Sequence, residues 1–346
     1  MKCVGRPSTP DDVPAIVALL AQAGMRGRTV EPHSLHWKYW QPRADWAGPR
    51  SFVLANGSSI VAHGGVIPGS CAWESRRIRT LHVIDWVASP REIGAGVALM
   101  NYIGQRAEAL LAIGGGPQTM QILPNIGFRA TGTAIGYARP LSSLRLLRGR
   151  GRRNWRRFLR FARSLAWRLA APPAVPGNGW LARCVGGDDL ERISAVFPVP
   201  TRGMGVCERS ADLFRYTLAC PIVPMQLYSV EREGRVRGYF LLASAPGQVR
   251  IADCWMDSDR PADWRAMINC AVAQAGRDRC AAEVVIWASD PLLSETVRAS
   301  GFHARQKTPI LLRPASGAAV PGAPVRAQML DNDAAYMNEG GSELWV

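Results

Sequence analysis

The sequence predicts an α+β protein made of two tandem copies of one unit, each a mixed, mostly antiparallel central sheet flanked by helices. An internal repeat is the main observation. Asp11-Asp12-Val13 and Asp188-Asp189-Leu190 each open a helix with periodic apolar residues, at an offset of 177 residues. Hairpin turns at Gly57 and Gly234 keep the same offset. The two halves therefore follow one plan.

Hydrophobic periodicity and turn residues predict the order of elements in the first half. Helices are expected at 12–23 and 33–40. Long strands rich in β-branched and aromatic residues follow at 50–57, 59–73 and 77–88. The unit is completed by a helix at 93–109, a strand at 110–114, a short helix at 118–126 and a strand at 133–140.

Composition bounds the organisation of the chain. With 346 residues and 47% hydrophobic content, the chain is long enough for about two domains. We expect an N-terminal unit at 1–141, an arginine-rich linker helix at 142–176, a second unit at 177–315, and a Pro/Gly-rich linker and tail at 316–346. Neither a signal peptide nor a run of about 18 apolar residues is present, so a cytoplasmic location is expected.

The eight cysteines are scattered and form no CxxC pair or histidine-spaced cluster. We expect them to be reduced, mostly buried, and not part of a metal site.

The net charge of +15 is concentrated in one segment. Residues 145–168 hold ten arginines and no acidic residue, and without these arginines the charge falls from +15 to +5. Apolar residues recur there at helical spacing from Trp155 to Leu169, with arginines on the other side. Such a helix suits an anionic membrane surface or packing between the two units, and nucleic acid ranks below both.

A glycine-rich turn follows the predicted strand 77–88 and opens the next helix. The segment reads Arg91-Glu92-Ile93-Gly94-Ala95-Gly96, and amides at a helix N-terminus suit a pyrophosphate. The pattern R-x-x-G-x-G in this context resembles the signature of the GNAT (GCN5-related N-acetyltransferase) superfamily. The helix-strand-strand order before it, Gly127-Phe128 after it, and His36-Trp37-Lys38-Tyr39 resemble bacterial tandem GNAT proteins, some linked to the cell envelope.

The resemblance implies acetyl-CoA as co-substrate, no metal, and direct acetyl transfer to an amine of a small molecule or a sugar or cell-envelope precursor. It implies contacts to the cofactor from Trp86, Val87, Arg91, Glu92, Ile93, Gly94, Ala95, Gly96 and Val97. Asp85, on the strand before the turn, is the first candidate base, and His82 is a weaker second. A splayed strand is expected to offer a backbone N–H to the thioester carbonyl.

Two positions depart from the family pattern. Leu123 stands where many members carry the tyrosine that protonates the leaving thiolate, and Gly116 replaces a cofactor-contacting asparagine. Tyr137, Tyr39 and Tyr102 are candidate substitutes for this acid. The aromatic residues Trp37 and Tyr39 line the same cleft or belong to the core.

The second half has no glycine between Trp255 and Gly276, and Asp257, Asp259 and Asp263 stand where a pyrophosphate would bind. These aspartates are expected to cap a helix, and the second unit is expected to hold no cofactor of its own. Two alternatives to an N-acetyltransferase stay open. One is a non-catalytic GNAT-like CoA-binding or scaffold protein, and the other is a Fem-like aminoacyltransferase that uses aminoacyl-tRNA.

Overall fold

After an unexpected first strand at Val4–Pro7, the first half folds in the order that its periodicity predicts. The computed structural model describes residues 3–74, 76–147, 155–201, 203–315, 321–338 and 344–345. The elements of the first half are β1 (Val4–Pro7), α1 (Val13–Gln22), α2 (Pro32–Tyr39), β2 (Ser51–Asn56), β3 (Ser59–Trp73), β4 (Arg76–Ala88), α3 (Ala95–Gly104), β5 (Ala109–Ile113), α4 (Pro117–Ile122) and β6 (Arg129–Pro140). Helix α3 is shorter than the expected 93–109: it begins after Gly94, which takes a left-handed conformation, and it already ends at Gly104.

The second half repeats this order after two connecting helices, α5 (Ser143–Leu147) and α6 (Trp155–Ala170). Its elements are β7 (Trp180–Val185), α7 (Glu191–Ser194), β8 (Gly205–Cys207), α8 (Ala211–Leu218), β9 (Met225–Arg232), β10 (Arg235–Ala245), β11 (Gln248–Met256), α9 (Pro261–Ala275), β12 (Glu283–Ala288), α10 (Pro291–Ala299) and β13 (His303–Pro314). A short strand, β14 (Val325–Arg326), and the turns Met329–Asp331 and Asp333–Ala335 follow.

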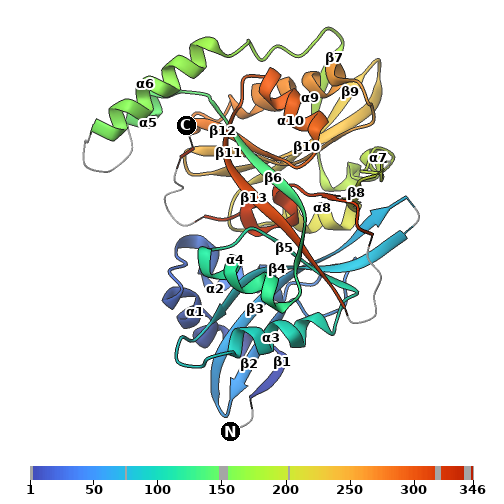
Figure 1. Cartoon of the computed structure of the whole chain (residues 1–346). Helices are drawn as coiled ribbons and strands as arrows, with labels where there is room; N and C mark the ends of the chain where they lie inside the picture. Colours follow the sequence, from blue (N-terminus) through green and yellow to red (C-terminus); the bar gives the residue numbers. More distant parts are fainter. Residues whose placement is uncertain are drawn as a thin grey trace.

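The strands of both halves join in one curved sheet. Its order is β1-β2-β3-β4-β5-β13-β6-β12-β11-β10-β9-β7. The closing strands are exchanged: β13 pairs with β5, and β6 pairs with β12. In Figure 1, β6 and β13 run side by side between the lower and upper halves. The mixed α+β architecture is confirmed, while the unit limits at 141 and 177 stay a proposal.

Helices cover both faces of the first-half strands. Phe52 and Leu54 of β2 face the apolar cluster that contains Leu99 of α3, whereas Val53 faces the cluster of α1 and α2. This alternation is the period of two that a strand buried on both faces requires. Strand β4 is packed in the same way, with Trp86 against the first cluster and Val87 against the second, so its end is held between two layers where the site lies.

The segment expected to be a linker and tail packs between the two halves where the structure describes it. Arg209 bonds both Asp253 and Asp331, at 2.8 Å each. The Asn338 amide donates to the Thr29 hydroxyl at 2.7 Å. Most side chains from 325 to 338 are buried. The C-terminal segment is thus part of the core between the halves.

Helix α6 projects from the body beside the second half (Figure 1). Ser164 is buried and Trp167 stacks on His303, with ring centroids 4.0 Å apart. Phe158 and Leu169, however, are 68% and 79% exposed. The expectation that this apolar stripe packs between the units is therefore wrong for these residues, because the helix turns other side chains inward. Among the described residues, no helix is both long and apolar enough to cross a bilayer.

Candidate functional site

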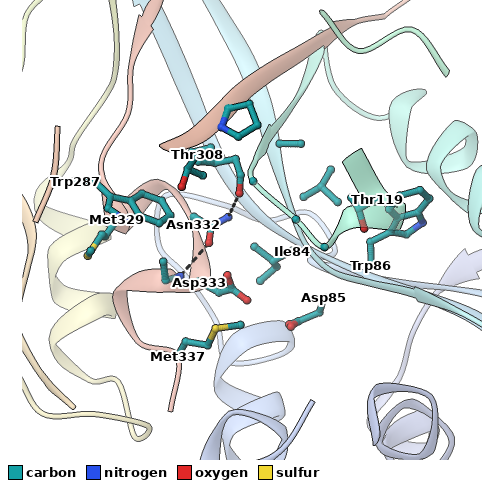
Figure 2. A pocket seen from close by; sticks show the side chains of 18 of the residues that line it. Ile84, Asp85, Trp86, Thr119, Trp287, Thr308, Met329, Asn332, Asp333 and Met337 are labelled. Atoms are coloured by element: carbon teal, nitrogen blue, oxygen red, sulfur yellow. Dashed lines mark hydrogen bonds between the residues drawn. The ribbon is translucent and has the colours of Figure 1, made fainter. Parts of the chain in front are cut away.

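A cleft opens where strands β4 and β5 separate. The two strands pair in parallel only over Thr80–His82 and Ala109–Leu111. Beyond this point the cleft has a volume of about 680 Å³. Its walls come from 83–87 of β4, from 112–116 at the end of β5 and the loop after it, from 306–309 of β13 and from 332–334 of the C-terminal segment (Figure 2). Both halves and the C-terminal segment therefore build one cavity.

Strand β4 carries a bulge at the cleft. The register with β3 shifts between His63 and Gly65, so that Asp85 and Trp86 face a single residue of β3. Asp85 has φ of +49°, a conformation that a residue other than glycine rarely adopts. Bulges of this kind redirect side chains beside functional sites. The splayed strand expected from the sequence is present, and its bulge lies at the candidate base.

Asp85 is buried and already paired. Lys38 of α2 forms an ion pair with its carboxylate, and the Tyr39 hydroxyl donates to it at 2.5 Å. His63 Nδ1 donates to the backbone carbonyl of Asp85 at 3.2 Å. Burial alone would raise the pKa of Asp85, but the charge and hydrogen bond of Lys38 hold this pKa below its usual value. Asp85 is therefore an ionised, neutralised group and a weak proton acceptor.

Asp333 is the second carboxyl group of the cleft. In Figure 2 its side chain and that of Asp85 point toward one another. Burial, with a further contribution from the charge of Asp85, raises the pKa of Asp333 to about 7. A general base works best with a pKa near the working pH. Asp333 fits that role better than Asp85.

The glycine turn before α3 has the conformation that anion binding needs. Gly94 has φ of +82°, and a Cβ added there would meet no atom within 4 Å. A Cβ on Gly96 would lie 3.3 Å from the Trp86 ring, so this glycine permits close packing of the helix on β4. Within the described chain, no backbone carbonyl accepts from the amides of Gly94, Gly96 or Val97.

Trp86 connects the turn to the cleft. Its ring lines the cleft, and its indole N–H donates to the Gly96 carbonyl at 3.0 Å. Val87 lines the same wall, whereas residues 91–97 lie outside it. Glu92 accepts from the Asn56 side chain at 3.4 Å, Ile93 is fully exposed, and Ala95 is buried. Trp86 therefore lies between the cleft and the first turn of α3, and Arg91 is exposed in the turn before that helix.

Other candidates from the sequence lie away from the cleft. His82 is buried against Thr80 and the Asp331 carbonyl, and it does not line the cleft. Tyr137 is buried in the sheet between β12 and β13, also outside the cleft walls. Tyr39 and Trp37 belong to the core, where Trp37 stacks on a tyrosine of α8. The structure thus brings only Asp85 of the proposed acid–base residues to the cavity.

Leu123 lines the cleft, at the position where an acid tyrosine was expected. The cleft walls contain no tyrosine among the described residues, and the hydroxyl side chains in them are Thr119 and Thr308. Gly116 belongs to the loop before α4, which also lines the cavity. The absence of the usual acid is therefore a feature of the cleft as well as of the sequence.

The expected capping role of the second-half aspartates is wrong. The residue before α9 is Arg260, and no side chain caps this helix. Asp263 instead accepts from the Ser258 hydroxyl at 2.6 Å, because it already lies in the first turn. These residues lie outside the cleft.

Sequence reasoning missed Lys38 and Asp333 as site residues. Lys38 lies in the His36–Tyr39 segment that carried part of the family resemblance. Asp333 lies in the C-terminal segment, where nothing in the composition indicates a catalytic group. Only the packing of this segment between the halves reveals it.

Comparison with solved structures agrees with this geometry. The chain matches a probable N-acyltransferase of unknown function from Enterococcus faecalis V583 with a TM-score of 0.59 and 12% identity, over 91% of this chain and 73% of that one. The chain has the GNAT fold. A GCN5-related N-acetyltransferase from Kribbella flavida gives 0.55 and 16%, over 93% and 74%. Saccharomyces cerevisiae N-myristoyltransferase with bound myristoyl-CoA gives 0.59 and 12%, over 91% and 79%.

No protein-family model and no curated sequence matches the chain. At these identities the structural likeness establishes the GNAT fold alone. The chemistry must then be argued from the cleft, the bulge and the turn that this GNAT fold places together.

The raised pKa of Asp333 predicts a pH-dependent stability. An unfolded aspartate titrates near 3.9, so between about pH 4 and pH 7 the folded chain holds a proton that the unfolded chain has lost. This contribution is complete below pH 4 and decreases as the pH rises to 7. Between pH 5 and pH 8, the free energy of unfolding of the wild type should fall by about 3 kcal/mol more than that of Asp333→Asn. Urea denaturation at each pH measures both.

The exposed Asp259→Asn is the matched control and should keep the pH slope of the wild type. An unchanged slope in Asp333→Asn would show that Asp333 titrates like a solvent-exposed aspartate.

Proposed function

We propose that the protein is an acyl-CoA-dependent N-acyltransferase, most simply an N-acetyltransferase. The observation that supports this best is the cleft at the splay of β4 and β5, adjoining a glycine turn with unpaired amides at a helix N-terminus. Such amides and the helix dipole favour a pyrophosphate. The cleft beside them suits an extended thioester arm. A pyrophosphate joined to a thioester is the chemistry of coenzyme A.

In this proposal the thioester lies beside the bulge of β4, where the strand has no partner on the cleft side. The amine nitrogen of the acceptor attacks the thioester carbonyl carbon, and a proton of the amine passes to the carboxylate of Asp333. The carbon–sulfur bond then breaks, and CoA leaves as a thiolate. Asp85, paired with Lys38, keeps the bulge in place, and its charge adds to burial in raising the pKa of Asp333.

The acceptor is proposed to be an amine of a small molecule or a sugar or cell-envelope precursor. The acyl group is open to test, because the yeast neighbour binds myristoyl-CoA and the cleft extends between the halves. A panel from acetyl-CoA to myristoyl-CoA measures which chain length the cleft accepts.

Acetyl-CoA binding tests the site directly. Gly94→Asp places a carboxylate at the turn, in open space, and should weaken binding at least about tenfold through repulsion of phosphate. Isothermal titration calorimetry measures the change. Gly234→Asp is the matched control, because Gly234 also has a positive φ, of +76°, and open space around it.

No binding of any acyl-CoA by the wild type, or equal binding by Gly94→Asp, would contradict the proposal. Tight tRNA binding without a response to CoA would favour the Fem-like aminoacyltransferase. Acyl-CoA binding with no release of free CoA over a panel of amines, after correction for hydrolysis, would favour the non-catalytic protein.

Asp333→Asn tests the proposed base. The variant should lower kcat by about 10²–10⁴-fold, since it cannot accept the amine proton. The wild-type rate should rise with pH through an apparent pKa near 7, because the carboxylate is the active form. Release of free CoA with a reactive amine, followed from pH 5 to pH 9, measures both. A variant that keeps the wild-type rate and profile would exclude Asp333 as the base.

We further propose that α6 docks on an anionic membrane surface. Phe158, Leu159 and Leu169 are more than half exposed, and Arg160 and Arg168 are exposed on the same helix. Arginines near headgroups each contribute on the order of 1 kcal/mol, and apolar side chains insert between them. Charge complementarity therefore favours acidic lipid.

The change Phe158→Ser with Leu169→Ser should abolish most sedimentation with vesicles containing phosphatidylglycerol. Wild type should bind these vesicles, bind less in high salt, and not bind vesicles of phosphatidylcholine alone. Val4→Ser with Val199→Ser is the control, because these apolar side chains are similarly exposed elsewhere. Equal binding by both double variants would refute the α6 surface.

A further inference from the structure

Two cysteines and a histidine from distant parts of the chain meet in the core. Cys71 lies on β3, His82 on β4 and Cys207 on β8. All three side chains are buried, with exposures of 0%, 4% and 3%. One potential ligand atom from each lies within 4.8 Å of the other two. This cluster does not line the acyl-CoA cleft.

We propose that Cys71, His82 and Cys207 form a zinc site that joins the two halves. Thiolate and imidazole are the ligands that zinc prefers among common metals. Two thiolates and a neutral imidazole balance the charge of Zn²⁺, which a dry interior requires. The three residues lack any metal-binding spacing in the sequence, which is why no metal is expected from the sequence alone.

The sulfur geometry fits a shared metal better than a disulfide. The two Sγ atoms lie 3.6 Å apart. Tetrahedral zinc with Zn–S bonds of 2.3 Å separates its two sulfurs by about 3.8 Å. A disulfide needs about 2.05 Å.

The histidine is oriented as a ligand. His82 Nδ1 lies 2.9 Å from the Asp331 carbonyl, which can only accept, so Nδ1 carries the proton. Nε2 is then the acceptor nitrogen, and in this structure it accepts from the Thr80 hydroxyl at 3.0 Å, while that hydroxyl lies 3.8 Å from Cys71 Sγ. Metal-binding histidines commonly donate their other N–H to a carbonyl in this way. The Thr80 hydroxyl lies between Nε2 and Cys71 Sγ, and a bound zinc ion would replace its hydrogen bond to Nε2.

The site would connect three regions that shape the cleft. His82 precedes Asp85 on β4, and Asp331 precedes Asp333 in the C-terminal segment. Cys207 is two residues before Arg209, which forms an ion pair with Asp331. A metal ion would thus fix the C-terminal segment against β4 without contacting substrate.

Metal content of the full-length chain tests the proposal. Protein purified without chelator should hold about one zinc ion per chain by elemental analysis. Cys71→Ser and Cys207→Ser should each lose most of it. Cys270→Ser, a buried cysteine in α9 outside the cluster, should retain it. After removal of zinc, CoCl2 should give thiolate charge-transfer and tetrahedral d–d absorption in the wild type and in Cys270→Ser only.

Wild-type chain alone gives a readout that does not depend on variants folding. ZnCl2 should raise the Tm of the chelator-treated protein and slow hydrogen exchange over 328–338. Zinc far below one equivalent together with no cobalt spectrum overturns the proposal. A thiol count that is two below the number of cysteines in the denatured, unreduced chain also overturns the proposal, in favour of a Cys71–Cys207 disulfide.

Discussion

Strand β13 fills the space between β5 and β6, and its backbone hydrogen bonds hold the two halves together. It pairs with β5 from Ile310 to Pro314 and with β6 along most of its length. Each half thereby depends on the other for the partner of its closing strand. The Gly114 amide also donates to the Pro309 carbonyl at 2.9 Å, which fixes the loop after β5. The exchange of the closing strands β6 and β13 between the halves therefore shapes the mouth of the cleft.

Buried charge is arranged around the cleft in two ways. Arg209 is shared by Asp253 and Asp331, so the C-terminal segment is anchored by a fully satisfied network. Asp85 has Lys38 as its ion-pair partner. At Asp333, burial and the charge of Asp85 outweigh the opposing charges of Lys38 and Arg250, and the pKa of this carboxyl group is raised. Removing a partner from a buried pair is costly, so Lys38 is needed wherever Asp85 is ionised. This asymmetry gives two neighbouring carboxyl groups different proton affinities.

Asp85 could be predicted as a site residue from the sequence, whereas Asp333 could not. Asp85 was recognised because it lies on the strand that leads to the glycine turn. The structure shows that it is buried and paired with Lys38 and Tyr39. Asp333 has no motif around it, and its position depends on the folding of the segment from 325 to 338 between the halves.

The sequence by itself determined the local elements, the repeated order of the two halves and the glycine turn at Gly94 and Gly96. These depend on periodicity and on backbone conformations that few residues allow. Only the tertiary structure decided the exchange of β6 and β13, the approach of Asp333 to Asp85, and the meeting of Cys71 with Cys207. Such contacts join residues more than a hundred positions apart, and long-range pairing of this kind leaves no trace in local spacing.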